Sequence, residues 1–456
     1  MTDPKTDLLQ ARPHFERLQV KLADRTAVCG VVGLGYVGLP LVGTLHDAGY
    51  RVLGFDVDSD KIEHLEAGSA YLGHVGEELP RQLARSSSFE STTNFTRLAE
   101  CDAILVCVPT PVDSQREPDL SYVEATARSI GEALQPGQLI VLESTTYPTT
   151  TRDVFLPAIL STSTGSPRLG NDLFVAFSPE REDPGRSTHR TKAIPKLVGG
   201  LDEPSTRLAT ALFAPAFDHV VPVQSAEIAE SAKILENVFR AVNIAMVNEM
   251  KMLFDRMDID IWEVIQAAST KPFGFMPFHP GPGLGGHCIP VDPFYLAWKA
   301  RECGLPTRFI ELAGEINHAM PEYVVGRCLS VLNEHSKSVS ESHILIIGMA
   351  YKANIDDIRE TPSVEIALRL KELGASVDYH DPHVPEVSDL RKHPGFRMLS
   401  VDLSKQLLAS TDLIIIATDH DALDWDLIGA SAGLIVDTRN AMARVRGPVA
   451  AVVCKA

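Results

Sequence analysis

Short apolar runs alternate with amphipathic stretches along this chain, and no other feature constrains its fold as strongly. Five runs before residue 181 resemble buried strands: TAVCGVVGLG, RVLGFDVD, CDAILVCVPT, GQLIVLEST and NDLFVAFSPE. Four more begin at Ser342: SHILIIGMAYK, ASVDYHDP, DLIIIATDH and LIVDTRN. Strands that alternate with helices form a parallel sheet with helices on both faces. The sequence therefore predicts an α/β protein with two Rossmann-like, doubly wound domains.

A stretch without glycine or proline separates the two blocks. Residues 225–257 carry apolar side chains at helical spacing, including Leu235, Val238 and Val242. A helix of that length would span roughly 50 Å and would join the two domains, and its apolar face could pack against another subunit. The predicted organisation is an N-terminal extension, a first α/β domain, a central helical segment and a second α/β domain: 1–25, 26–224, 225–335 and 336–456.

Composition excludes several classes of protein. The formal net charge of −18 argues against a nucleic-acid-binding protein, although a few local cations could still hold an anionic ligand. No run approaches the roughly 18 apolar residues of a membrane span, and the polar N-terminus does not resemble a signal peptide, so we expect a cytoplasmic protein. The seven cysteines form no CxxC pair and no metal-binding spacing. We therefore expect free thiols and no metal site.

The segment from Gly33 to Gly38, Gly-Leu-Gly-Tyr-Val-Gly, follows an apolar strand and opens a helix. Its glycines allow a tight turn and close approach of a pyrophosphate to the helix N-terminus. Asp56 ends the next strand, where an acid binds the adenosine ribose and repels the 2′-phosphate of NADP. The pattern predicts NAD as cofactor. The alternative is that the glycines serve only strand–helix packing.

A cysteine lies in the glycine-rich segment Pro280–Cys288, PGPGLGGHC. Such a backbone can approach a ligand closely, and a helix that starts near Asp292 would favour the thiolate form of Cys288. By itself the segment fits either a catalytic nucleophile or a plain structural loop.

Three polar residues elsewhere are weaker candidates for the site. Lys233 and Asn237 are four residues apart and share a helix face, which is more often solvated than functional. Glu180 follows a strand end, where open α/β sheets bind ligands, but surface carboxylates are common.

Taken together, seven segments of the chain resemble the nucleotide-sugar 6-dehydrogenase family. The resemblance covers nearly the whole chain from Thr26. It rests on GLGYVG (33–38), VPTP (108–111), ESTT (143–146), SPERED-PG (178–185), AESAKILENVFRAVNIAMVNEM (229–250), PGPGLGGHCIPVDP (280–293) and MAYKANIDDIRETPS (349–363). The family includes the UDP-glucose, UDP-N-acetylglucosamine and UDP-N-acetylmannosamine dehydrogenases.

The resemblance implies a role for each matching residue. The implied cofactor-binding residues are Gly33, Gly35, Tyr36, Val37, Gly38, Asp56, Lys61, Thr110, Thr145 and Arg359. The implied catalytic cluster is Cys288, Lys233, Asn237, Asp292 and Glu180. The implied substrate-binding residues are Glu180, Lys233, Asn237, Gly285, Tyr351 and Lys352. The second α/β domain would bind the UDP-sugar, and residues 225–257 would form a homodimer or a higher homo-oligomer.

The implied reaction is an NAD-dependent, four-electron oxidation of the C6 hydroxyl of a UDP-hexose, through a thiohemiacetal and a thioester on Cys288. Its product would supply a polysaccharide. His287 stands where UDP-glucose enzymes typically carry serine, and STKPFGFMPFHPGPG (269–283) resembles the UDP-N-acetylglucosamine enzymes. We therefore expect UDP-N-acetylglucosamine as substrate, with UDP-glucose, UDP-N-acetylgalactosamine and UDP-N-acetylmannosamine as alternatives. From other classes, the rivals are a two-electron β-hydroxyacid dehydrogenase and an inactive NAD-binding module.

Overall fold

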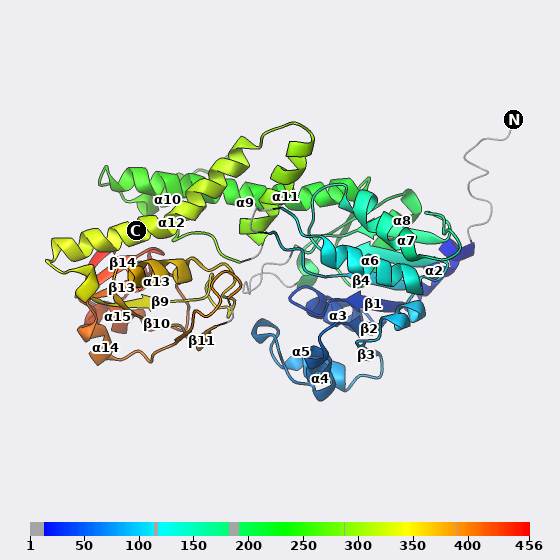
Figure 1. Cartoon of the computed structure of the whole chain (residues 1–456), viewed down its shortest axis with the longest axis horizontal. Coiled ribbons are helices and arrows are strands. Elements are labelled where there is room, and N and C mark those ends of the chain that lie inside the picture. The colour runs from blue at the N-terminus through cyan, green and yellow to red at the C-terminus, as the bar shows by residue number, and fades with distance from the viewer. Residues whose placement is uncertain (1–12, 114–116, 182–190, 287, 389) are drawn as a thin grey trace. The chain divides into compact units, whose positions relative to one another are not determined.

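The computed structural model describes residues 13–113, 117–181, 191–286, 288–388 and 390–456. The chain divides into two compact units (Figure 1). Unit 1 is 1–236 with 301–303, and unit 2 is 237–300 with 304–456. No helix in the described ranges is long and apolar enough to cross a membrane.

The sheet of unit 1 has eight strands in the order β3-β2-β1-β4-β5-β6-β7-β8. Their bounds are Val28–Val32 (β1), Arg51–Phe55 (β2), Phe89–Thr92 (β3), Ala103–Val106 (β4), Gln138–Leu142 (β5), Leu173–Phe177 (β6), Lys196–Gly200 (β7) and Val220–Pro222 (β8). All neighbouring strands are parallel except β6 and β7, which are antiparallel. The predicted doubly wound fold is confirmed, but the sheet is not wholly parallel.

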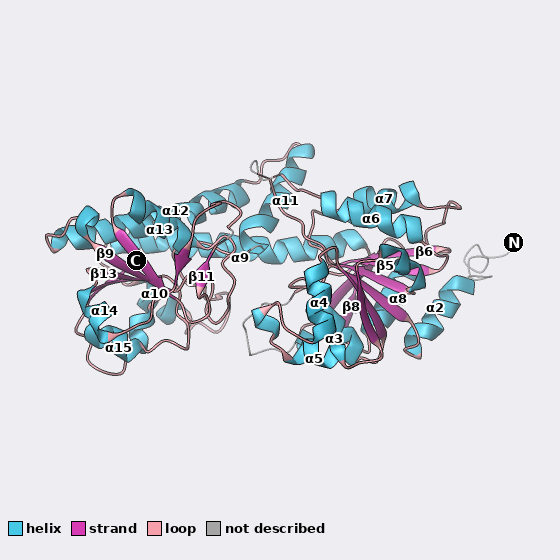
Figure 2. Ribbon diagram, turned by 60° about the horizontal axis from the view of Figure 1, so that its bottom comes forward, coloured by secondary structure: helices cyan, strands magenta, loops and turns pink. Residues whose placement is uncertain are grey.

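Helices cover both faces of this sheet (Figure 2). They are α2 (Pro13–Ala23), α3 (Gly38–Asp47), α4 (Ser59–Ala67), α5 (Glu78–Ala84), α6 (Ser121–Ala133), α7 (Leu156–Thr162) and α8 (Glu203–Phe213). Side chains alternate in direction along each strand. In β1, Cys29 and Val31 join the core beneath α3 and α8, whereas Val32 joins the core beneath α6 and α7. The central strands β1, β4, β5 and β6 are buried on both faces, which explains their largely apolar sequences.

Helix α2 lies in the segment 1–25 that the sequence suggested to be a simple extension. Phe15, Leu18 and Leu22 of this helix are buried in the core of unit 1. The hydroxyl of Tyr50 donates to the carbonyl oxygen of Leu22 at 3.2 Å. The N-terminal extension predicted over 1–25 thus includes the helix Pro13–Ala23, whose apolar face contributes to the core of unit 1.

Truncation of Leu22 should destabilise unit 1. Leu22→Ala removes a fully buried side chain and is expected to lower the free energy of unfolding by about 2–5 kcal/mol. Denaturant titration followed by circular dichroism measures this loss. Val20→Ala is the matched control because Val20 is on the same helix and 59% exposed. Equal effects of the two variants would show that α2 does not belong to the core.

The long helix predicted over 225–257 is α9, Ala226–Asp255, and the division between the units falls within it. It is followed by α10 (Ile261–Ala268), α11 (Cys288–Glu302) and α12 (Arg308–Glu334). The sequence placed a helix start near Asp292, but α11 already begins at Cys288. Pro290 lies in its first turn, where the missing N–H costs little. Cys288 is thus the first residue of the helix itself.

The sheet of unit 2 has five parallel strands in the order β10-β9-β13-β14-β15. The bounds are His343–Ile347 (β9), Ser376–His380 (β10), Leu413–Ile416 (β13), Leu434–Asp437 (β14) and Val452–Lys455 (β15), with a separate pair Glu386–Val387 (β11) and Met398–Leu399 (β12). Helices α12 and α13 (Pro362–Glu372) pack on one face, and α14 (Lys405–Ser410) and α15 (Trp425–Ser431) on the other. The second doubly wound domain is confirmed.

Candidate active site

The predicted cofactor loop joins β1 to α3. Gly33 has a φ of +90°, which favours glycine, and its N–H donates to the carbonyl oxygen of Phe55 at 2.8 Å. A Cβ on Gly38 would lie 1.8 Å from the carbonyl oxygen of Gly33, so no other residue fits there. A Cβ on Gly35 would meet nothing within 4 Å. The backbone at Gly35 is therefore open to a ligand at the start of α3.

Asp56 fixes this loop from the end of β2. It is 5% exposed. Its Oδ2 accepts from the backbone N–H of Leu34 at 2.8 Å and from the ammonium of Lys61 at 2.9 Å. The structure thus brings together Asp56, Lys61 and the glycine loop as the sequence predicted.

This arrangement fits a dinucleotide. The open backbone at Gly35 would receive the pyrophosphate at the N-terminus of α3, flanked by the half-buried Tyr36 and Val37. Asp56, with Lys61 beside it, would receive the ribose.

Substitution of Asp56 should weaken NAD binding selectively. Asp56→Ala removes the acceptor of the Leu34 N–H as well as the ribose partner, and we expect the Kd for NAD to rise about tenfold or more. Isothermal titration calorimetry measures this change. Asp60→Ala, at an exposed position in the first turn of α4, is the control. Unchanged affinity in Asp56→Ala would contradict the assignment.

Thr110 and Thr145 also lie together in unit 1. The hydroxyl of Thr110 donates to the carbonyl oxygen of Thr145 at 2.8 Å. The chain after Thr145 is held by Glu230 of α9, a buried residue absent from the sequence predictions. Its carboxylate accepts from the backbone N–H of Thr149 at 2.6 Å and of Thr151 at 2.9 Å. Burial raises the pKa of Glu230 to about 7.

Glu180 follows β6 and lies against a buried lysine that the sequence also did not single out. The ammonium of Lys196 is 2.6 Å from Oε2 of Glu143 and 3.3 Å from Oε2 of Glu180. The backbone N–H of Arg181 donates to the other oxygen of Glu180 at 2.6 Å. Glu180 is therefore fixed at both carboxylate oxygens, at the carboxyl edge of the sheet.

Lys233 and Asn237 are buried rather than solvated, at 8% and 4% exposure. No described residue of unit 1 accepts a hydrogen bond from the ammonium of Lys233. In unit 2, the amide of Asn237 donates to Oδ2 of Asp292 at 2.6 Å, and Asp292 is 1% exposed. Asp292 lies one helical turn after Cys288 in α11. The side chain of Cys288 and all of His287 lie outside the described part of the chain.

The remaining predicted residues of unit 2 surround the glycine-rich segment. A Cβ on Gly285 would lie 2.3 Å from the Cβ of Tyr351, so these two residues touch closely. The N–H of Gly286 donates to the carbonyl oxygen of Arg359 at 2.8 Å. The guanidinium of Arg359 is paired with Asp357, with Nη2 at 2.6 Å from Oδ2. Lys352, next to Tyr351, is half-buried.

Arg439 is a further candidate that the sequence reasoning missed. It follows β14, and its Nε donates to the carbonyl oxygen of Ala417 at 2.8 Å. A Cβ on Gly281 would lie 2.7 Å from Nη1 of Arg439, so the guanidinium borders the glycine-rich segment. Neither terminal nitrogen of Arg439 has a hydrogen-bond partner among the described residues. Burial of the guanidinium lowers the pKa of Arg439. Its place after a parallel strand was the signal available in LIVDTRN.

Asp381 of unit 2 lies at the position in its sheet that Asp56 has in unit 1. Like Asp56, it follows the second strand of its sheet and accepts backbone N–H groups of the first turn, here from Met349 at 2.6 Å and Ala350 at 2.9 Å. It also accepts from Nε2 of His420 at 3.0 Å and, through Oδ1, from the backbone N–H of His383 at 2.8 Å. As in Asp56, whose Oδ1 accepts from the backbone N–H of Asp58 at 3.0 Å, both oxygens accept hydrogen bonds from the protein.

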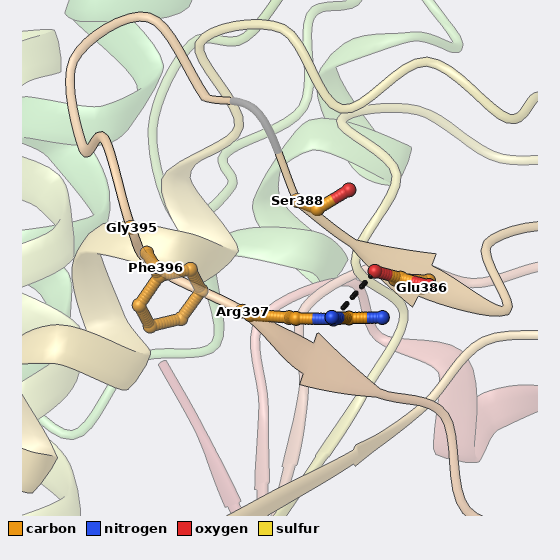
Figure 3. Close-up of a pocket in the computed structure, with 5 residues that line it drawn as sticks. All are labelled: Glu386, Ser388, Gly395, Phe396 and Arg397. Atoms are coloured by element: carbon orange, nitrogen blue, oxygen red, sulfur yellow. Dashed lines mark ion pairs between the residues drawn. The ribbon is translucent and has the colours of Figure 1, made fainter.

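A cavity of about 270 Å³ lies at the β11–β12 pair (Figure 3). Its lining includes Phe396, Ser388 and Arg397, and Nε of Arg397 is paired with Oε1 of Glu386 at 2.7 Å. None of the described lining residues is a predicted site residue. Within the described ranges, no group of three or more His, Cys, Asp and Glu side chains could hold a metal.

Three family models match the chain in order. They are the NAD binding domain (27–217), the central domain (227–319) and the UDP binding domain (345–444) of the UDP-glucose/GDP-mannose dehydrogenase family. The chain belongs to this family. It is therefore an NAD-dependent UDP-sugar dehydrogenase by family, as the resemblance implied, and NAD is its cofactor.

Similar proteins carry different substrate names. The chain is 37% identical over 357 residues to a UDP-N-acetyl-D-glucosamine 6-dehydrogenase of Pseudomonas aeruginosa, covering 78% of this chain and 82% of that one. It is 32% identical over 404 residues to a UDP-N-acetyl-D-mannosamine dehydrogenase of Methanococcus maripaludis, covering 88% and 87%. The solved structure of a UDP-D-ManNAc dehydrogenase from Pyrococcus horikoshii matches with a TM-score of 0.82 and 30% identity, covering 93% and 98%.

Proposed function

We propose that this enzyme oxidises C6 of a UDP-hexose, most specifically UDP-N-acetylglucosamine, to the carboxylate in a four-electron reaction, with Cys288 as the nucleophile. The observation that carries the proposal is the hydrogen bond of 2.6 Å between Asn237 and Asp292, one turn after Cys288. The buried carboxylate of Asp292 can activate water to hydrolyse an acyl group carried by Cys288, and the amide of Asn237 holds that carboxylate in place.

The Gly33–Gly38 loop and Asp56 would hold NAD, which would supply a hydride acceptor for each of the two oxidations, alcohol to aldehyde and thiohemiacetal to thioester, one NAD for each. Lys233 supplies an ammonium without a described partner in unit 1, which can stabilise negative charge on O6, with Asn237 as a second donor. The thiolate of Cys288, favoured at a helix N-terminus, would add to the aldehyde carbon as a thiohemiacetal and hold C6 until it is a thioester. Water then cleaves the C–S bond, with Asp292 and Glu180 as the groups that accept its proton.

The second unit supplies groups suited to the UDP moiety. Tyr351 and Lys352 follow β9, and Arg439 follows β14 with both terminal nitrogens unpaired by the described protein. A guanidinium with free donors is well matched to a diphosphate. We propose Arg439 as an addition to the predicted substrate-binding residues, and we keep Arg359 as a cofactor-binding residue.

The choice of sugar rests on the sequence around the nucleophile. Relatives named for N-acetylglucosamine and for N-acetylmannosamine are similarly distant, so identity alone does not decide. The segment STKPFGFMPFHPGPG and His287 favour the N-acetylglucosamine substrate. A panel of UDP-glucose, UDP-galactose, UDP-N-acetylglucosamine, UDP-N-acetylgalactosamine and UDP-N-acetylmannosamine tests this through kcat/KM for NADH release. A higher kcat/KM for any other member would overturn the assignment.

We further propose a homodimer formed through α9, within a central domain that spans residues 225–335. The helix exposes several large apolar side chains: Ile228, Leu235, Phe239, Met246 and Leu253. Apolar side chains gathered on one helix are typical of an interface. Light scattering on the purified protein measures the mass, and a monomer at micromolar concentration would contradict the dimer.

A further inference from the structure

Lys196 is a buried cation in the interior of unit 1. It begins β7 and is 3% exposed. Its ammonium donates to Glu143 at 2.6 Å, to Glu180 at 3.3 Å and to the carbonyl oxygen of Pro179 at 3.3 Å. The three contacts match the three donors of an ammonium. The ring centroids of Phe213 and Phe217 lie 5.3 and 5.4 Å from Nζ of Lys196. The ammonium therefore contacts its three acceptors in an otherwise apolar environment.

Of the two carboxyl groups that contact Lys196, that of Glu143 is more deeply buried than that of Glu180. The side chain of Glu143 is fully buried at the end of β5, and its Oε1 has no hydrogen-bond partner among the described residues. Burial, opposed by Lys196 and reinforced by Glu180, raises the pKa of Glu143 to about 7. The buried thiol of Cys107 is the remaining titratable neighbour, and burial raises its pKa well above the usual value. Glu143 therefore changes charge near neutrality.

A simple structural role explains this arrangement poorly. Replacing a buried ion pair by apolar side chains is often neutral or stabilising, and Lys196 already lies against two phenylalanine rings. Two carboxylates share one ammonium, and the more exposed of them, Glu180, reaches the carboxyl edge of the sheet where α/β proteins bind ligands. The array thus connects the buried core to one residue of the proposed catalytic cluster.

We propose that Lys196 is a positioning residue that orients the carboxylate of Glu180, and that the charge of Glu143 sets how strongly Lys196 holds it. This inference rests on the proposed function, which assigns Glu180 to hydrolysis of the thioester. When Glu143 is neutral, the ammonium is balanced by Glu180 alone, and Glu180 is a weaker base. When Glu143 ionises, two carboxylates share one positive charge, and Glu180 accepts a proton more readily. Hydrolysis should therefore accelerate as pH rises through the ionisation of Glu143.

The kinetic test uses three variants and a matched control. Lys196→Met should lower kcat about 10²-fold, with the KM for NAD changed less than about twofold, and Lys196→Arg should restore most of the rate. Glu143→Gln mimics the neutral carboxyl group, so its kcat should stay at the low-pH value of the wild type and should no longer rise as the pH passes through neutrality. Lys192→Met removes the same charge from a side chain that is 43% exposed, and it should change neither kcat nor its pH profile. Wild-type kcat and pH profile in Lys196→Met would overturn the inference.

A second measurement does not depend on turnover or on the stability of Lys196→Met. Infrared difference spectra of the substrate-free protein should show a carboxyl band that titrates near neutrality in the wild type and is absent from Glu143→Gln. A wild-type spectrum without that band would overturn the role of Glu143, whatever the substrate. A failure of the proposed function would give a different result. The wild-type band would still titrate near neutrality, but Glu180→Gln would turn over at the wild-type rate.

Discussion

Replacement of Cys288 with serine is expected to lower the rate of uronic acid formation by at least about 10³-fold. The serine hydroxyl is not ionised near neutrality, whereas a thiol at the first position of α11 is favoured as thiolate. The first, two-electron oxidation does not need the nucleophile, so slow interconversion of alcohol and aldehyde can remain. Mass spectrometry of the nucleotide sugars separates aldehyde from acid.

Cys303→Ser provides the control for this experiment. Cys303 is an exposed free cysteine, and its replacement should leave acid formation unchanged. Acid-quenched wild-type enzyme should carry a covalent uronosyl adduct by intact-protein mass spectrometry, and Cys288→Ser should not. Complete four-electron turnover by Cys288→Ser would exclude covalent catalysis at this residue.

The exchange of Asn237 for aspartate is expected to lower kcat about 10²-fold or more. It places a second carboxyl group 2.6 Å from Oδ2 of Asp292 in a buried site. Two carboxyl groups so close must share a proton near neutrality, and one pKa rises strongly. Asp292 is then protonated at the pH where it should accept a proton, and activity should return only in alkaline solution. The pH profile of kcat measures this shift.

The reversed pair separates chemistry from folding. Asn237→Asp combined with Asp292→Asn restores one carboxylate and one amide at the same positions, so thermal stability should recover toward wild type. Activity should stay low, because the carboxylate is now on α9 rather than one turn after Cys288. Asn243→Asp adds the same charge to α9 at a half-buried position and serves as control. Recovery of full activity in the double variant would show that either position can supply the base.

Local patterns in the sequence were sufficient for the cofactor loop. The glycines at 33, 35 and 38 and the acid at 56 sit within a single strand–turn–helix–strand unit, so spacing alone predicted their contacts. The same holds for the strands of both sheets, whose apolar runs reflect burial on both faces. The sequence placed the start of this helix near Asp292, whereas α11 begins one turn earlier, at Cys288.

Contacts between distant segments were not accessible in this way. Lys196 and Glu143 are 53 residues apart and Glu230 and Thr149 are 81 apart, and neither pair leaves a periodic or motif signal. Helix α2 was overlooked because Phe15, Leu18 and Leu22 are separated by polar residues in the sequence. Their burial becomes visible only when α8 and the sheet are in place. The catalytic cluster was predicted from the family resemblance. Spacing alone was equally consistent with a solvated helix face for Lys233 and Asn237 and with a structural loop for Cys288.

The number of NADH molecules formed for each UDP-sugar consumed tests the central claim most directly. With limiting UDP-N-acetylglucosamine and excess NAD, the wild-type enzyme should release two NADH and one uronic acid per substrate, without free aldehyde in solution. One NADH per substrate, with an aldehyde or ketone as product, would contradict four-electron oxidation at Cys288.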